Sequence, residues 1–238
     1  MSYRKLDPGQ IVATLHRLEQ RIGERFPGTS LLAVCRDLVA ISTKTEERSQ
    51  SIAKPNLALR LAVAIAIIAG LSGLVAVALS INVQVGNSEI FTILQGIDAA
   101  ANIVVLVGAA LFFLITLETR HKRSRSLRDL HTLRSIAHVI DMHQLTKDPS
   151  VLIAGASATS TESSPERTMT SFELTRYLNY CSEMLSLTNK LAALYAQHLP
   201  DPVVIEAVND SEDLTSNLSS KIWQKITIID TAKSQRTA

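Results

Sequence analysis

Two long stretches without a charged residue constrain the fold of this chain more than any other feature. Residues 61–81 form an uncharged run of 21 residues, and residues 99–117 form a second run of 19. A helix of about 20 residues, rising roughly 1.5 Å per residue, matches the ~30 Å hydrocarbon core of a bilayer. The first run contains only two serines as polar residues, so it lacks the polar side of a soluble core helix. We therefore predict two transmembrane spans, residues 61–81 and 98–117, in a helical hairpin of residues 55–117.

The charges around the two spans predict their direction. The connecting residues 82–98 contain no Lys or Arg, whereas basic residues precede the first span and follow the second. Short loops rich in Lys and Arg stay on the cytoplasmic side of a membrane. We therefore expect a multi-pass protein of the plasma (inner) membrane, with both termini in the cytoplasm and the short connection outside.

Five basic residues follow the second span closely and form the basic cluster: Arg120, Lys122, Arg123, Arg125 and Arg128. Anionic lipid headgroups attract such residues by about 1 kcal/mol each. The net charge of +2 at pH 7 therefore needs no nucleic acid to explain it. A nucleic-acid site would place aromatic residues among the basic ones, and the cluster has none. The expected partner is a bilayer with anionic headgroups.

Residues 1–54 are predicted to form N-terminal cytoplasmic helices. Asp7 can cap the first helix, and Pro8 fits its first position. A Phe-Pro-Gly turn ends this helix, and a second helix with a more polar later half begins near Ser30. Apolar residues recur along one face of the first helix at spacings of three and four: Ile11, Leu15, Leu18 and Ile22.

The second span is expected to continue beyond the membrane. No Gly or Pro occurs between residues 108 and 149. We predict one long helix from about residue 98 to residue 145, of which residues 118–146 form a basic juxtamembrane stalk. Residues 147–167 are rich in Ser, Thr, Ala and Pro without a helical period, which predicts a flexible linker. Apolar residues continue at helical spacing past the basic cluster: Leu130, Leu133, Ala137 and Ile140.

Residues 168–232 are predicted to form a cytoplasmic helical pair, and the whole chain to be all-α. Thr170 and Glu173 match a capping box at the start of the first helix. A second apolar stripe makes this helix suit a bundle better than a two-stranded coil. The last helix begins at Pro202, and residues 233–238 are expected to fray. The seam of the first helix is Leu174, Leu178, Cys181, Leu185, Thr188, Ala192, Tyr195 and Leu199, and the expected buried side of the last is Val204, Val208, Leu218, Ile222, Ile226 and Ile229.

Two groups of residues could carry chemistry. His131, His138 and Asp141 share one helical face, but three ligands on one helix, without a second set elsewhere, are a weak signal for a metal site. Asp98 and Asn102 lie four residues apart near the outer end of the second span. There they could line a pore or make an interhelical hydrogen bond. We predict neither a metal nor a cofactor.

The cysteines and the single tryptophan have simpler interpretations. Cys35 and Cys181 lie among apolar helical positions, so we expect them to be buried and reduced. Trp223 is flanked by Lys221 and Lys225. Such a segment can return to a membrane surface, but packing of the Trp on the bundle is the favoured interpretation.

The sequence contains no phosphate-binding glycine loop, G-x-S-x-G, H-E-x-x-H or C-x-x-C motif, so no enzyme is predicted. We predict an integral membrane protein whose hairpin anchors a cytoplasmic helical interaction module, a scaffold or sensor that associates with itself or with a protein partner through its cytoplasmic helices. The alternative is an oligomeric channel or pore-forming membrane effector. The layout of a two-span hairpin and a basic stalk over about residues 55–145 resembles the SLATT class of two-span bacterial effectors. That resemblance implies pore formation.

Overall fold

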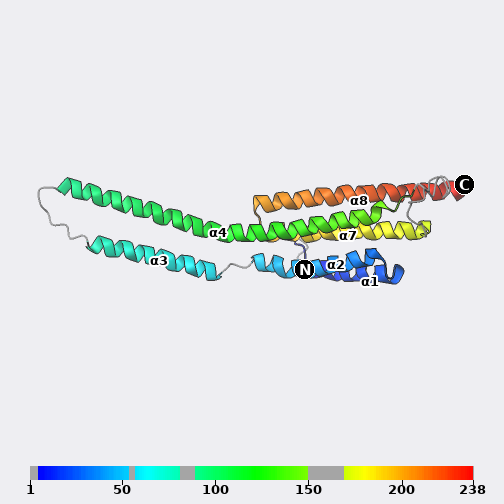
Figure 1. Cartoon of the computed structure of the whole chain (residues 1–238), viewed down its shortest axis with the longest axis horizontal. Coiled ribbons are helices and arrows are strands. Elements are labelled where there is room, and N and C mark those ends of the chain that lie inside the picture. Colours follow the sequence, from blue (N-terminus) through cyan, green and yellow to red (C-terminus); the bar gives the residue numbers. More distant parts are fainter. Residues whose placement is uncertain (1–4, 54–56, 81–88, 150–168, 238) are drawn as a thin grey trace. The chain divides into compact units, whose positions relative to one another are not determined.

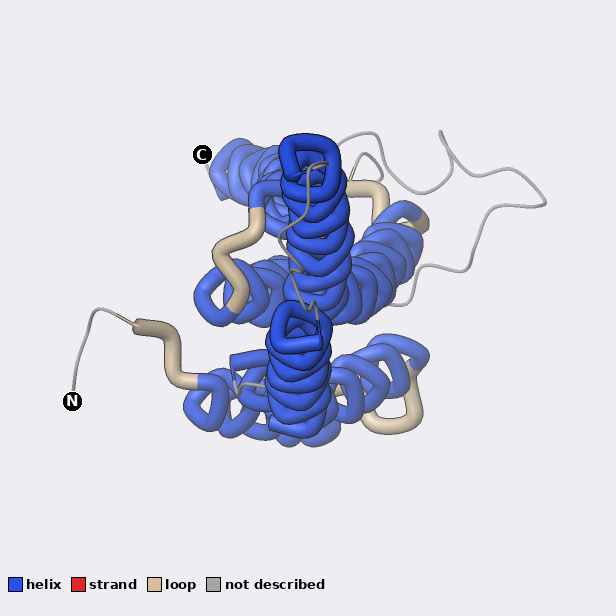
Figure 2. The backbone as a smooth tube through the Cα atoms, turned by 90° about the vertical axis from the view of Figure 1, so that its left-hand side faces the viewer, coloured by secondary structure: helices blue, strands red, loops and turns tan. Residues whose placement is uncertain are grey.

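The computed structural model describes residues 5–53, 57–80, 89–149 and 169–237. Within these ranges every regular element is a helix (Figures 1 and 2), which confirms the predicted all-α fold class. The described helices, in chain order, are α1 (Pro8–Arg25), α2 (Ser30–Ala53), α3 (Leu57–Ser80), α4 (Glu89–Leu145), α7 (Ser171–His198) and α8 (Pro202–Thr237).

The described helices belong to two compact units. The first unit, the helical bundle, comprises the described parts of residues 1–53 and 125–238. It therefore contains α1, α2, α7, α8 and the C-terminal part of α4. The second unit, the apolar unit, comprises the described parts of residues 54–124, with α3 and the N-terminal part of α4.

The start and the end of α1 follow from local sequence. The Asp7 side chain accepts hydrogen bonds from the backbone N–H of Gly9 at 2.9 Å and of Gln10 at 3.4 Å, and a proline begins the helix, as predicted. After α1 ends, Gly28 adopts a φ of 70°, a left-handed conformation that suits a residue without Cβ and lets the chain reverse into α2. The predicted stripe is confirmed because all four of its residues are buried: Ile11, Leu15, Leu18 and Ile22.

One face of the polar later half of α2 lies in the core of the bundle. Ser42, Thr45 and Ser49 are buried and continue the three-four spacing of the apolar residues before them. Their hydroxyls are partnered within the helix or nearby: Ser42 Oγ donates to the Val39 carbonyl at 2.7 Å, and Ser49 Oγ to the Glu46 carbonyl at 3.1 Å. Burial therefore leaves these two hydroxyls satisfied.

α7 is the helix around which the bundle is built, since it contacts α1, α2 and α8. The predicted capping box is confirmed, with Thr170 and Glu173 each binding the other's backbone. Buried residues fall on several faces of α7, and the five seam residues Leu174, Leu178, Cys181, Leu185 and Tyr195 are all among them.

α4 and α8 complete the bundle. One continuous helix, α4, begins nine residues before the expected start at residue 98 and ends at the expected residue 145. α8 remains helical to Thr237, through residues that were expected to fray. Most of the predicted linker, residues 150–167, lies outside the described residues. The expected buried sides are confirmed: Leu130, Leu133, Ala137 and Ile140 on α4, and Val204, Val208, Leu218, Ile222, Ile226 and Ile229 on α8.

The apolar unit carries large apolar side chains on its surface. Of the described residues, one helical stretch, Ala101–Leu145, is long and apolar enough to cross a membrane, with a mean hydropathy of 2.2 in its most apolar part, none of which is buried. α3 contains the first predicted span, residues 61–81, except its last residue, and begins four residues before it. Gly70 of α3 faces Val107 of α4, because a Cβ built on the glycine would lie 3.8 Å from the valine Cγ2. The two-span hairpin remains a prediction.

Candidate functional site

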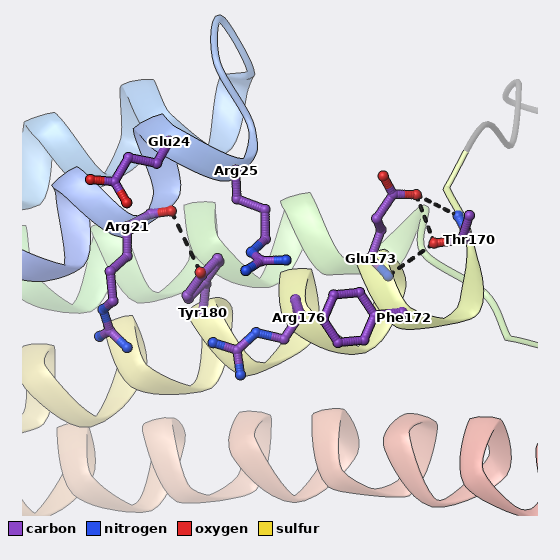
Figure 3. Close-up of a pocket in the computed structure, with 8 residues that line it drawn as sticks. All are labelled: Arg21, Glu24, Arg25, Thr170, Phe172, Glu173, Arg176 and Tyr180. Carbon is purple, nitrogen blue, oxygen red and sulfur yellow. Dashed lines mark hydrogen bonds between the residues drawn. The ribbon is translucent and has the colours of Figure 1, made fainter.

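A pocket of about 600 Å³ lies between the C-terminal end of α1 and the N-terminal end of α7 (Figure 3). Both helices belong to the bundle. We call it the arginine pocket because three of its residues are arginines. Its lining is Arg21, Glu24, Arg25, Thr170, Phe172, Glu173, Arg176 and Tyr180.

Local helix geometry brings these side chains to one place. Arg21 and Arg25 are one turn apart on α1, and Phe172, Arg176 and Tyr180 are one turn apart on α7. Residues four apart on a helix share a face. Since α1 packs against α7, the two rows of side chains meet, as the close-up shows (Figure 3).

Each of the three guanidinium groups lies over an aromatic ring. Arg21 and Arg176 lie 5.7 and 5.3 Å from the centre of the Tyr180 ring, and Arg25 lies 5.3 Å from the centre of the Phe172 ring. The electron-rich faces of the rings attract the cations. Arg21 also forms an ion pair with Glu183 of α7, so its charge already has a partner on the surface of the bundle.

The carboxylate of Glu173 is already used by the helix cap. Its Oε2 accepts hydrogen bonds from the Thr170 backbone N–H at 2.7 Å and from the Thr170 hydroxyl at 2.8 Å. The backbone N–H, then the hydroxyl, lower the pKa of Glu173 because both donate to its ionised form, and the nearby Arg25 acts in the same direction. Glu173 is therefore a negatively charged acceptor whose Oε2 is already engaged with Thr170.

A second polar group ties three helices of the bundle together. The Asp129 carboxylate of α4 pairs with Arg48 of α2 and accepts a hydrogen bond from the Tyr195 hydroxyl of α7 at 3.1 Å. Its side chain is only 11% exposed. Burial is the main cause that raises the pKa of Tyr195, and the neighbouring Asp129 charge adds to it. Asp129 therefore connects α4 to both neighbours through one carboxylate.

The basic cluster and the polar pair Asp98 and Asn102 lie on α4. Lys122 pairs with Glu118 at 2.9 Å, while Arg120, Arg125 and Arg128 are exposed. Asp98 and Asn102 are exposed as well, and their spacing places them on one face of the helix.

The three residues considered as metal ligands, His131, His138 and Asp141, also lie on α4. His131 and His138 are exposed, and Asp141 accepts a hydrogen bond from the Gln144 side-chain nitrogen at 2.6 Å. In the part of the chain that the structure describes, no three His, Cys, Asp or Glu residues are placed to hold a metal ion.

Trp223 is 57% exposed, so the favoured interpretation that it packs on the bundle is wrong.

The two cysteines are free and buried. Burial raises the pKa of Cys35 and of Cys181 to about 12 in each case, because a thiolate would lose its hydration there. Both thiols are therefore protonated near neutral pH, and neither has the lowered pKa of an activated nucleophile.

Sequence reasoning missed the arginine pocket and Asp129. The rows of Arg21 with Arg25, and of Phe172 with Arg176, are visible as spacings of four, but such pairs on single helices are common. Nothing in the spacing says that the two rows meet. Comparison of the chain with known protein families, with curated proteins and with solved structures finds no match. The pore formation that the resemblance to the SLATT class implies remains a prediction.

Proposed function

We propose that this chain is a non-enzymatic integral membrane protein. Its helical hairpin, α3 and the first part of α4, spans the bilayer twice and anchors a cytoplasmic helical interaction module, the bundle. The observation that carries this proposal is the exposure of Val104, Val105 and Leu106, at 63%, 68% and 70%. Consecutive helical residues point in directions about 100° apart, so these side chains cover most of the helix circumference. Soluble monomers rarely expose such surfaces, whereas hydrocarbon accommodates them.

The basic cluster supports the direction of insertion. It follows the apolar part of α4 directly, where a cytoplasmic flank of a span is expected. In this position its side chains would contact anionic headgroups of the inner leaflet, with about 1 kcal/mol from each basic residue. The plasma (inner) membrane, with both termini in the cytoplasm, is therefore the proposed location.

A thiol-accessibility experiment tests this topology. We would introduce Asn87→Cys in the predicted outer connection and, separately, Gln235→Cys in the exposed last turns of α8. A membrane-impermeant maleimide should label Asn87→Cys in intact cells and Gln235→Cys only after permeabilisation. The unmodified chain is the control, because its two cysteines are buried and protonated. Labelling of Gln235→Cys in intact cells, or protection of Asn87→Cys there, would contradict the proposal.

The second candidate function is an oligomeric channel or pore. Asp98 and Asn102 are exposed on one face of α4, and in hydrocarbon such groups need polar partners. Further copies of the chain would supply them. Light scattering on nanodisc-embedded protein, corrected for lipid, separates the two functions. A defined oligomer with ion leakage that Asp98→Asn reduces would favour the pore, and a monomer without leakage would favour the anchored module.

A further inference from the structure

We propose that the arginine pocket binds a small soluble molecule that carries a phosphate group. Arg25 and Arg176 would hold the phosphate, and the exposed part of the Phe172 side chain would contact the organic part. The proposal concerns the bundle alone and does not depend on how many times the chain crosses a membrane. The pocket volume, about 600 Å³, lies within the range of roughly 300–1,000 Å³ that is usual for small-ligand sites.

The two arginines retain their hydrogen-bond donors. Unlike Arg21, neither Arg25 nor Arg176 forms an ion pair with another described residue. The guanidinium carbon of each lies over an aromatic ring, 5.3 Å from the ring centre. A cation–π contact uses the positive charge and none of the hydrogen-bond donors, so the N–H groups stay available for a ligand. A planar fork of N–H donors matches two oxygens of a phosphate group.

The rings also hold the arginines in place before any ligand arrives. Tyr180 is buried and lies beneath Arg176, so the position of that guanidinium is supported by the core of the bundle. Phe172 is 56% exposed, lies on α7 like Tyr180 (Figure 3), and contacts Arg25 of α1. Arginines that are ordered in advance lose less conformational entropy when they bind.

The acidic residues in and beside the pocket differ in whether their carboxylates already have a partner. Formal charges in the pocket nearly balance, so the N–H donors of the arginines, rather than the net charge, favour an oxyanion. The Oε2 of Glu173 is occupied by Thr170, and Glu183 is paired with Arg21. Glu24 has no hydrogen bond or ion pair with a described residue. It would therefore repel a bound phosphate, and its removal should strengthen binding. The positive end of the α7 dipole adds a favourable contribution at the same mouth.

The test is a calorimetric titration of the full chain, in nanodiscs of neutral phosphatidylcholine, with pyrophosphate. We expect saturable binding that weakens about tenfold or more in Arg25→Gln and in Arg176→Gln, since each loses charge-assisted hydrogen bonds. Arg176→Lys, which keeps the charge but loses the fork, should give an intermediate affinity. Glu24→Gln should bind more tightly. Arg17→Gln is the matched control, because Arg17 is exposed on α1 and does not line the pocket.

The outcomes separate this proposal from its rivals. Absence of pyrophosphate binding by the unmodified chain, or equal weakening by Arg17→Gln, would overturn it. A second experiment uses nanodiscs that contain phosphatidic acid. Binding seen only in these nanodiscs would assign the pocket to a lipid headgroup and would overturn the proposal of a soluble ligand. Thermal unfolding of each variant shows whether it folds. Glu24→Gln leaves both arginines in place, so its tighter binding tests the proposal even if an arginine variant does not fold. None of these results bears on the topology measured by thiol labelling.

Discussion

The carboxylate of Asp129 provides a direct test of how α4 is held in the bundle. It binds Arg48 of α2, 81 residues away in sequence, and Tyr195 of α7, 66 residues away. Because the Asp129 side chain is nearly buried, its hydrogen bond with the Tyr195 hydroxyl is formed where water competes little. The Arg48 side chain is 42% exposed, so its ion pair is partly screened.

The energies follow from these environments. A hydrogen bond to a charged group contributes about 1.5–3 kcal/mol, and a neutral one about 0.5–1.5 kcal/mol. The substitution Tyr195→Phe removes the bond but keeps the ring, so we expect a loss of about 1.5–3 kcal/mol in the free energy of unfolding. Asp129→Asn weakens the same bond and leaves Arg48 unpaired, which adds about 0.2–1 kcal/mol. The coupling energy in a double-mutant cycle should be about 1 kcal/mol, the difference between a charged and a neutral bond.

The assay is urea and thermal unfolding of the full chain in nanodiscs, followed by far-ultraviolet circular dichroism. A loss of 1 kcal/mol should lower Tm by roughly 2–4 °C in a protein of this size. Asp37→Asn is the matched control, since Asp37 is an exposed carboxylate on α2. Additive losses in the double variant, or a loss in Asp37→Asn equal to that in Asp129→Asn, would refute the role of the Asp129–Tyr195 bond.

Three further predictions use the same unfolding measurement. Leu178→Ala should lower the free energy of unfolding by about 2–5 kcal/mol, because removal of the fully buried side chain leaves a cavity. Leu178→Met nearly conserves the volume and should cost less than about 1.5 kcal/mol. Equal losses in the two variants would contradict the close packing around Leu178. Thr170→Ala should lower the free energy of unfolding by about 0.5–2 kcal/mol, because it removes the cap of α7. Thr170→Ser keeps the hydroxyl and should retain most of that stability. The folded-state pKa values of Cys35 and Cys181 lie near 12, above the ordinary 9.0, so their contribution to stability is complete below about pH 9 and is lost as pH rises toward 12. Stability should therefore fall in that pH range, with a smaller slope in the variant Cys35→Ala with Cys181→Ala, and an unchanged slope would count against burial of the thiols.

Several elements could be predicted from sequence because their causes are local. The caps at Asp7 and Thr170 each depend on residues within one helical turn, and the structure forms both. The buried faces of α1 and α8 follow from apolar residues at spacings of three and four, since a helix on the outside of a bundle buries one stripe of its surface. The long helix α4 follows from the absence of Gly and Pro over its later part.

Polar residues in the core were harder to predict. Ser42 and Ser49 of α2 are polar residues, but both are buried. Their hydroxyls bind carbonyl groups of their own helix, so burial costs little free energy, and hydropathy alone does not reveal this. Trp223 shows the opposite case, because its apolar character suggested packing and the bundle leaves it exposed.

The sequence by itself determined where the helices lie and which face of most of them is apolar, because both depend on neighbours within one or two turns. Only the tertiary structure decided which faces meet. Arg25 lies over Phe172, and Asp129 binds Tyr195, because α7 packs against α1 and its Tyr195 reaches Asp129 of α4. An apolar stripe specifies that a face is buried but not which helix covers it, since dispersion and the hydrophobic effect have little direction. The arginine pocket and the Asp129 connection arise from that choice of partners.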